Sequence, residues 1–194
     1  MISARALERR YGAKRVIAGL DLDVAERGFL VVVGPNGSGK STLLALLAGL
    51  LAPTGGRLDV RADRAEIGFL AHEPLVYRDL TGLENLDLYG RLYRVPERRE
   101  RIGMLLERYG LWDARGERVS AFSRGMAQRL GLCRTLLHDP RLVLLDEPYS
   151  ALDADGAAVL DAELAELAGK RTLVLATHDP GRVGRHATAE VALA

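Results

Sequence analysis

Residues 34–41 read GPNGSGKS, and this stretch decides the fold. It matches the phosphate-binding pattern G-x-x-x-x-G-K-[ST], in which glycines let backbone N–H groups turn toward phosphate oxygens. The apolar run Phe29–Val33 precedes it and the apolar segment Ser41–Leu50 follows it, as a strand and a helix should. Because the N-terminus of that helix adds a positive dipole end, the stretch predicts an anion site between strand and helix.

Two side chains of this loop have a predictable role in binding phosphate. Lys40 offers a compact ammonium to β- and γ-phosphates, where a bulky guanidinium would fit poorly. Ser41 offers a hydroxyl to Mg²⁺. Lysine is rare in this chain, because arginine supplies nearly all of its 27 basic residues. We expect the phosphate-binding segment to consist of Gly34, Pro35, Asn36, Gly37, Ser38, Gly39, Lys40, Ser41 and Thr42.

Bulk composition narrows the class of protein. The 194 residues suffice for one good core and are too few for two ordinary domains. A net charge of +1 gives no global argument for binding nucleic acid. The one cysteine, Cys133, excludes an internal disulfide and sits in an apolar helical pattern as a small buried side chain. No signal peptide opens the chain and no apolar run approaches the roughly 20 residues of a membrane span, so any membrane role should depend on a partner.

Hydrophobic periodicity and turn residues predict an α/β protein. The expected strands cover Val16–Val24, Phe29–Val33, Arg57–Val60, Glu66–Leu70, Leu142–Asp146, Thr172–Ala176 and Ala189–Leu193. The expected helices cover Lys40–Leu51, Gly82–Tyr93, Glu97–Tyr109, Arg124–His138 and Asp155–Ala168. The second begins with a capping box, Thr81-x-x-Glu84. Short continuous apolar strands are typical of a mostly parallel sheet covered on both faces. We expect residues 1–71 and 139–194 to form the α/β core and residues 72–138 to form an inserted helical subdomain within a single domain.

Polar residues follow two of the apolar strands. Asp146 and Glu147 end the strand Leu142–Asp146, where the first carboxylate suits a magnesium site, directly or through water, and the second suits a general base. His178 follows another strand and could contact a γ-phosphate. Because the carboxyl ends of parallel strands gather where ligands bind, these side chains should lie near the phosphate loop. Alone, such a histidine is more often structural.

A further motif lies in the helical part of the chain. Residues 122–129 read FSRGMAQR, and Ser123 is a plausible N-cap for the helix that follows. Taken by itself, the motif says no more than that. Since helix N-termini also bind anions, a second phosphate site is an open alternative.

Taken together, these motifs resemble ATP-binding cassette (ABC) ATPases. The phosphate loop, FSRGMAQR, LVLLDEP at 142–148, SALD at 150–153 and His178 occur in the order and spacing of that family. The resemblance covers nearly the whole chain. It implies a P-loop core with a mostly parallel sheet, an N-terminal antiparallel β portion and an inserted helical subdomain.

The resemblance also implies roles for particular residues. Glu147 would be the catalytic base, His178 the switch histidine and Lys40 the phosphate-binding lysine, with ATP and Mg²⁺ as ligands. Tyr11 would stack on adenine. Ser123 and Gly125 would reach ATP across a dimer interface, and Asp153 would lie in the loop that links the two sites. The family implies two ATP molecules sandwiched between two such domains, so the partner would be a second ATPase domain, most simply a homodimer.

Two positions depart from the family pattern. FSRGM stands where LSGGQ is usual, so Arg124 and Met126 replace a glycine and a glutamine. His72 stands where the family places a glutamine that senses Mg²⁺ and the membrane partner. A histidine can hydrogen-bond a metal-bound water, so His72 joins Ser41 and Asp146 as an expected metal-site residue, although a packing role is the alternative.

His72 narrows the resemblance to one group within the family. Together with LTGLENLDLYGRLY at residues 80–93, it makes the chain similar to the ATP-binding subunit of the cytochrome c maturation haem exporter. That resemblance implies an integral membrane permease as partner, haem handled by partners if at all, and a place on the cytoplasmic face of the inner membrane. The chain itself has no C-x-x-C-H motif. Alternatives are another exporter ATPase, a soluble cassette protein acting on translation or DNA, and a phosphate-loop kinase or GTPase, although FSRGM and SALD have no role in the last.

Overall fold

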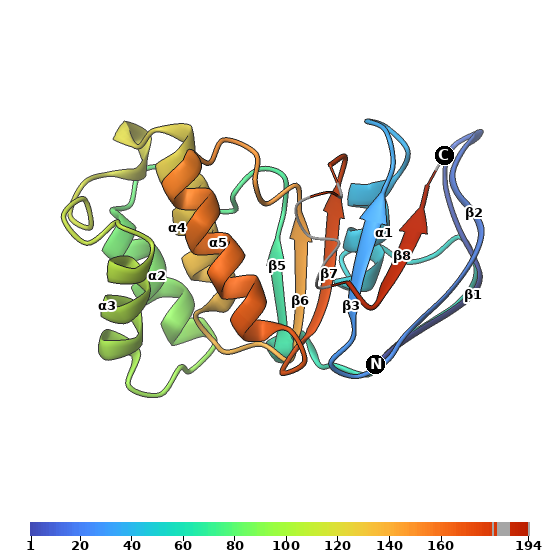
Figure 1. Cartoon of the computed structure of the whole chain (residues 1–194), viewed down its shortest axis with the longest axis horizontal. Helices are drawn as coiled ribbons and strands as arrows, with labels where there is room; N and C mark the ends of the chain where they lie inside the picture. The colour runs from blue at the N-terminus through green and yellow to red at the C-terminus, as the bar shows by residue number, and fades with distance from the viewer. Residues whose placement is uncertain (180, 182–186, 194) are drawn as a thin grey trace.

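Five parallel strands form the centre of the molecule (Figure 1). The computed structural model describes residues 1–179, 181 and 187–193. The strands are β3 (Phe29–Val33), β5 (Ile67–Leu70), β6 (Leu142–Asp146), β7 (Thr172–Thr177) and β8 (Ala189–Ala192). Their order across the sheet is β5-β6-β7-β3-β8, and every pairing is parallel. The predicted α/β fold with a parallel sheet is confirmed.

Strands β3, β5, β6 and β7 are buried on both faces, which explains why they read as continuous apolar runs. Along β6, Val143 and Leu145 pack into one hydrophobic cluster with the helices that follow β5. Leu142 and Leu144 point the other way into a second cluster that contains the first helix and the N-terminal sheet. Alternate residues of one strand therefore connect the two halves of the core.

A second, antiparallel sheet lies on the N-terminal side, in the order β2-β1-β4. It contains β1 (Ile2–Tyr11), β2 (Lys14–Val24) and β4 (Gly55–Val60). The sequence pattern did not predict β1, because the alternation of buried and exposed residues along this strand is interrupted. Ile2 and Ala4 are buried, but a register shift at Ala6, whose φ is +46°, brings Leu7 rather than Ala6 into the core. Such a bulge removes the period-2 signal.

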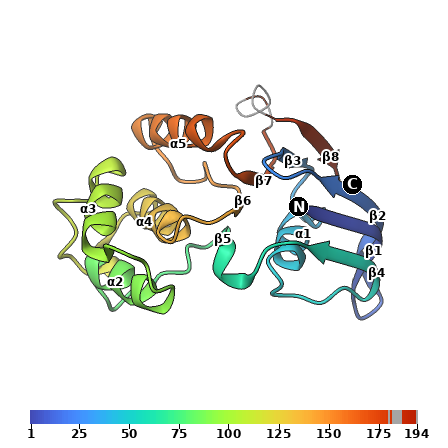
Figure 2. The same ribbon diagram turned by 90° about the horizontal axis from the view of Figure 1, so that it is seen from below.

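Five helices and two 3₁₀ turns complete the described part of the chain. They are α1 (Lys40–Leu47), α2 (Gly82–Leu92), α3 (Arg98–Arg108), α4 (Arg124–Leu136), α5 (Ala154–Leu167), and turns at Arg64–Glu66 and Val119–Ala121. In Figure 2, α2, α3 and α4 gather at the end of the molecule opposite the antiparallel sheet. Among the described residues, no helix is long and apolar enough to cross a bilayer.

Local signals place the helix ends well, with one exception. The predicted capping box of α2 is present, since the Thr81 hydroxyl accepts from the Glu84 N–H and the Glu84 carboxylate accepts from the Thr81 N–H. The prediction for α1 was wrong at its end: the helix stops at Leu47, not Leu51, because the chain turns through Gly49, whose φ is +67°. The other predicted helix ends lie within two residues of the observed ones.

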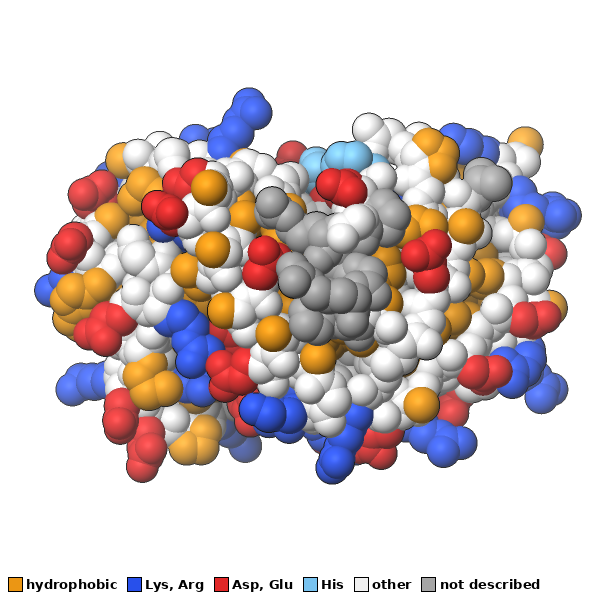
Figure 3. All heavy atoms as spheres, in the orientation of Figure 1, with side chains coloured by type: hydrophobic (Ala, Val, Ile, Leu, Met, Phe, Trp, Pro, Cys, Tyr) orange, Lys and Arg blue, Asp and Glu red, His pale blue; other side chains and the backbone are white. Residues whose placement is uncertain are grey.

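The sheet topology brings the chemical motifs to one edge. The phosphate loop follows β3, Glu147 follows β6, and His178 follows β7, and β7 lies between β6 and β3. Since all three strands run the same way, their carboxyl ends share one rim of the sheet. In the space-filling view, histidine side chains show at the rim toward which the strand arrows of Figure 1 point (Figure 3).

His138 gives the fold a dependence on pH. Its ring stacks on Tyr93 with ring centroids 4.0 Å apart, and its Nε2 lies 3.2 Å from the Ile67 carbonyl oxygen. Burial, which disfavours the charged ring, lowers the pKa of His138 below its ordinary value. As pH falls through that ordinary value, about 6.5, the unfolded chain binds a proton before the folded chain does. The folded state therefore loses stability on acidification.

We expect His138→Gln to lose less stability than the wild type when the pH is lowered from about 7.5 to about 5.5, because the substitution removes this linkage. Urea unfolding at the two pH values measures the difference. The lost stacking on Tyr93 weakens the variant equally at both values, so it cancels in the comparison. Equal losses of unfolding free energy in the two proteins would contradict the assignment.

Candidate functional site

A cavity of about 420 Å³ lies where the phosphate loop meets the ends of β6 and β5. The predicted residues that line it are Asn36, Gly37, Gly39, Lys40, Ser41, Thr42, His72, Asp146 and Glu147. These residues come from three separate parts of the sequence, so the fold assembles most of the predicted phosphate and metal site in one place. The cavity opens at the N-terminus of α1, where the helix dipole favours an anion.

The loop glycines adopt conformations that other residues rarely take. Gly37 has φ +85° and Gly39, which precedes α1 as its N-cap, has φ +101°. A Cβ added to Gly39 would meet a methyl group of Val16 at 2.9 Å, so β2 packs directly on the loop. The glycines therefore supply both the left-handed turn and the close packing that the pattern predicts.

Lys40 is the buried cation of the site. Its side chain is only 6% exposed, and its Nζ donates to the Gly34 carbonyl at 2.7 Å and to the Pro35 carbonyl at 3.2 Å. The same Nζ lies 3.4 Å from Oε1 of Glu147. A buried ammonium is stable only when it is paired and hydrogen-bonded, and the loop carbonyls with Glu147 meet that need. The arrangement holds a positive charge at the mouth of the anion cradle.

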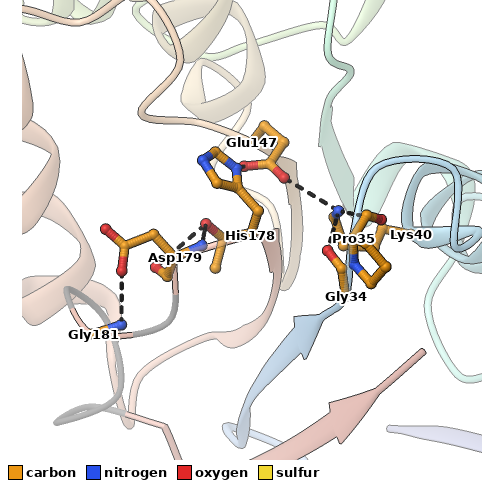
Figure 4. A network of polar contacts seen from close by, with 8 residues as sticks. Gly34, Pro35, Lys40, Glu147, His178, Asp179 and Gly181 are labelled. Carbon is orange, nitrogen blue, oxygen red and sulfur yellow. Dashed lines mark hydrogen bonds and ion pairs between the residues drawn. The ribbon is translucent and has the colours of Figure 1, made fainter. Parts of the chain in front are cut away.

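Glu147 lies between Lys40 and His178 (Figure 4). Its Oε2 is 3.0 Å from Nδ1 of His178, while its other carboxylate oxygen faces Lys40. Glu147 has φ +47°, an uncommon conformation for a residue with a side chain, and its N–H donates to the Ala176 carbonyl on β7. Backbone strain of this kind persists where the surrounding structure fixes it, often at functional sites. The sheet thus fixes the direction of this carboxylate.

Asp146 has the features of a cation ligand. It is 2% exposed, and its Oδ1 is buried without a hydrogen-bond partner. Burial raises the pKa of the carboxyl above its ordinary value, and the Ser41 hydroxyl and His72 oppose that rise. A carboxylate with one oxygen left without a hydrogen-bond partner, beside a hydroxyl and an imidazole, fits a Mg²⁺ site. Among the described residues, no group of three or more histidine, cysteine or acidic side chains could hold a metal ion.

The remaining predicted residues lie outside the cavity lining. Tyr11 is half exposed at the end of β1, with the Arg9 guanidinium 4.6 Å from its ring centroid. Ser123 caps α4 by accepting from the Met126 N–H at 3.1 Å. Their assignments toward ATP stay predictions.

Gly125 and Asp153 lie at the starts of two helices: Gly125 is the second residue of α4, and Asp153 is the N-cap of α5. A Cβ added to Gly125 would meet the Ala151 carbonyl oxygen at 2.8 Å, so the segment before α5 packs closely on the start of α4. Asp153 caps α5 by accepting from the Gly156 N–H at 2.8 Å. Each residue thus has a local structural role in addition to the predicted one.

Sequence reasoning missed two residues of the cavity, Lys14 and Val16. Both lie at the start of β2, directly after the turn that follows β1. Since β1 was not predicted, the sequence could not show that the start of β2 packs against the phosphate loop. One signal was available for Lys14: it is one of only three lysines in an arginine-rich chain.

Comparison with known proteins agrees with this geometry. The family model described as ABC transporter matches residues 17–150. The ATP-binding protein YxlF of Bacillus subtilis (strain 168), an uncharacterized ABC transporter component, is 38% identical over 184 residues, covering 92% of this chain and 62% of YxlF. The daunorubicin resistance ATP-binding protein DrrA3 of Streptomyces coeruleorubidus is 39% identical over 187 residues, covering 91% and 59%.

Solved structures show the same fold. The dimeric structure of MJ0796, a bacterial ABC transporter cassette, superimposes with a TM-score of 0.90 at 28% identity, covering 100% of this chain and 94% of that one. A dimeric post-hydrolysis state of the same cassette, bound to ADP and Pi, gives a TM-score of 0.89 at 27% identity.

The chain belongs to the ABC transporter family. More particularly, it has the fold of the ABC ATPase domain. It spans about three fifths of the length of the curated relatives named above.

We expect Glu147→Gln to bind ATP and to hydrolyse it at least ~100-fold more slowly than the wild type, from the usual contribution of a general base.

Lys40→Ala should lose nucleotide binding or turnover, because the loop then lacks its ammonium. Phosphate release under saturating Mg-ATP, together with binding of a fluorescent ATP analogue, measures both effects.

A matched control is Lys170→Ala, which removes another lysine of the chain at an exposed position outside this cavity. Near wild-type turnover in Glu147→Gln would contradict its role as base. Normal kinetics in Lys40→Ala would contradict the assignment of the phosphate loop.

Proposed function

We propose that this chain hydrolyses ATP and drives a conformational cycle in a membrane transporter. The observation that carries the proposal is the row formed by Lys40, Glu147 and His178 at the rim of the phosphate loop. A cation for the phosphates and a side chain that positions the attacking water are groups that phosphoryl transfer uses. Here the carboxylate of Glu147 can position the water, and the imidazole of His178 lies beside that carboxylate.

In this reaction, water attacks the γ-phosphorus in line with the bridging oxygen. The new bond joins the water oxygen to phosphorus, and the bond that breaks joins phosphorus to the oxygen of the leaving ADP. Glu147 orients the water and accepts its proton, which then passes to solvent. Lys40 and the N–H groups of the loop stabilise negative charge on the transferred group. His178, hydrogen-bonded to Glu147, fixes the direction of the carboxylate and can contact the γ-phosphate.

Ser41, Asp146 and His72 are the residues that would hold Mg²⁺, directly or through water. When bound, the ion would supply positive charge that stabilises the negative charge developing on the phosphates. The unpartnered Oδ1 of Asp146 supports this assignment. The chain contributes a single dedicated carboxylate at this position, which suits an ion that arrives with a nucleotide.

A second ATPase domain completes the site in this proposal. Ser123 and Arg124 are exposed at the start of α4, and Ser123 and Gly125 would meet the nucleotide of the partner. Dimeric structures of a similar cassette support this assembly. Asp153 would lie between the two sites. The simplest partner is a second copy of this chain.

An integral membrane permease is the proposed second partner. Exposed apolar side chains lie on and near the segment that follows His72: Leu75 is 48% exposed, Tyr77 53% and Leu83 43%. Apolar side chains left in water over adjoining segments are typical of a protein–protein interface. Since this surface adjoins the cavity through the His72 segment, a permease there could respond to the nucleotide. Through such a partner the chain would work at the cytoplasmic face of the membrane.

The particular transporter we propose is the haem exporter of cytochrome c maturation. The support is the family resemblance in residues 80–93 and the histidine at position 72. Membrane partners, and not this chain, would handle haem. In that system, ATP hydrolysis would serve either haem export or the release of a haem-loaded chaperone.

A second candidate is an exporter of another substrate. The similarity to a daunorubicin resistance ATP-binding protein, at 39% identity, supports this alternative. The two candidates share the ATPase cycle and differ in the permease that they require.

Two measurements in the source cells test the proposal: one tests the haem-exporter assignment and the other tests the transporter assignment. Deleting the gene should remove covalent c-type haem from a haem-stained gel. Wild-type protein should restore the bands, and Lys40→Ala, expressed to the same level, should not. Membranes carrying tagged Glu147→Gln should retain a permease with the chain when ATP is present.

Unchanged haem bands, with a permease retained, would reject the haem exporter and favour the second candidate. Failure of Glu147→Gln to retain any membrane protein would overturn the transporter assignment itself. Salt-sensitive binding to ribosomes or DNA in its place would favour a soluble cassette protein.

A further inference from the structure

The segment from His72 to Leu80 has no helix or strand of its own, yet side chains of α2 hydrogen-bond its backbone at Leu75, Tyr77 and Leu80. Such a segment must satisfy its backbone polar groups through side chains or water. Three side chains do so here: Asn85 and Tyr89 from α2, and Arg134 from α4. Each of them is directed at a backbone carbonyl or N–H of this segment or of the strand that leads into it.

Asn85 is the principal attachment. It is fully buried, with 0% of its surface exposed. Its Oδ1 accepts from the Tyr77 N–H at 2.7 Å, and its Nδ2 donates to the carbonyls of Tyr77 at 3.0 Å and Thr81 at 2.9 Å. Burying an amide is costly unless its hydrogen bonds are made, and here both ends of the amide are used on the segment and its junction with α2.

Tyr89, one turn further along α2, makes the second attachment. Its hydroxyl donates to the Leu75 carbonyl at 2.9 Å, three residues after His72. Its ring also lies under the Arg134 guanidinium, at 5.3 Å from the centroid, and Arg134 donates to the Phe69 carbonyl at the end of β5. The segment is therefore held on both sides of His72: at Phe69 before it and at Leu75 after it.

His72, at the start of this segment, faces the nucleotide cavity. His72 lines the cavity together with Ser41 and Asp146. His72 itself is exposed, and no hydrogen bond of its side chain is found within the described residues. Its position relative to Asp146 is thus determined by the attachments of the backbone on either side.

We infer that Asn85 and Tyr89 are positioning residues for His72. They fix the segment to α2, so that the imidazole takes up its place beside the metal end of the cavity and moves with α2 when that helix moves. This inference rests on the proposed ATP hydrolysis. It names Asn85 and Tyr89 as the residues that couple helix α2 to the hydrolysis site. Neither side chain touches the cavity.

Tyr89→Phe is the sharpest test, because it removes one hydroxyl and keeps the half-buried ring. Tyr93→Phe is the matched control, since Tyr93 caps the same helix and stacks on His138, and no hydrogen bond from its hydroxyl to the segment is found among the described residues. We expect Tyr89→Phe to lower kcat for Mg-ATP about three- to ten-fold, the effect of one hydrogen bond, and Tyr93→Phe to leave it unchanged. The KM for ATP should change little, because the loop that binds the phosphates is intact.

A double-mutant cycle separates positioning from a general structural effect. In a His72→Ala background, Tyr89→Phe should change kcat by less than about two-fold, since the residue it positions is gone. Independent losses that multiply would show that Tyr89 acts elsewhere and would overturn the inference. Asn85→Asp, which keeps the acceptor and loses the donor, should behave as Tyr89→Phe does; if it fails to fold, the Tyr89→Phe cycle still decides.

A binding measurement gives the same cycle without hydrolysis. The Kd of a fluorescent ATP analogue is measured once in the presence of Mg²⁺ and once in the presence of EDTA. The Kd in EDTA divided by the Kd in Mg²⁺ reports how much the metal contributes to binding. Tyr89→Phe and His72→Ala should each reduce this ratio, and together they should reduce it no further. Additive reductions, or an unchanged ratio in Tyr89→Phe, would overturn the positioning role. A wild-type chain that hydrolyses no ATP would instead overturn the proposed function, and the binding cycle would still decide the role of Tyr89.

Discussion

The site depends on one buried ammonium. Lys40 lies almost out of water, so its charge must be compensated by the chain itself. The Gly34 and Pro35 carbonyls and the Glu147 carboxylate provide this compensation from two different strand ends. One interaction thus joins the phosphate loop after β3 to the carboxylate after β6. In the proposed cycle, an arriving phosphate would give Lys40 a second anionic partner, and this exchange would free Glu147 to face water.

The parallel sheet makes that interaction possible. The order β6-β7-β3 places β7 between the strand that leads into Glu147 and the strand that leads into the phosphate loop with Lys40. His178 directly follows β7. Burial of both faces of the sheet, with alternate residues of β6 in separate clusters, holds these strand ends in register. The core is therefore what keeps three groups from distant parts of the sequence within hydrogen-bonding range, and loss of sheet packing would disperse them.

Much of this arrangement could be predicted from the sequence, and the exceptions have physical causes. Short motifs with fixed local geometry were visible: the glycine pattern of the loop, the carboxylates after an apolar strand, and the capping box at Thr81. Features that depend on tertiary register were not. The bulge at Ala6 hid β1, and with it the return of Lys14 and Val16 to the cavity. The sequence also showed Asn85 only as a polar residue on a helix. Its burial against the His72 segment follows from how a loop without secondary structure satisfies its backbone.

The most direct measurement is a calorimetric titration of the nucleotide-free chain with ATP, ADP and AMP in the presence of Mg²⁺. If the phosphate loop and Lys40 supply the affinity, ATP and ADP should bind, and AMP should not bind at the same concentrations. AMP lacks the β- and γ-phosphates that the buried ammonium would hold. Binding of AMP as tight as that of ATP would place the affinity in contacts to the base, and would contradict a site organised around Lys40.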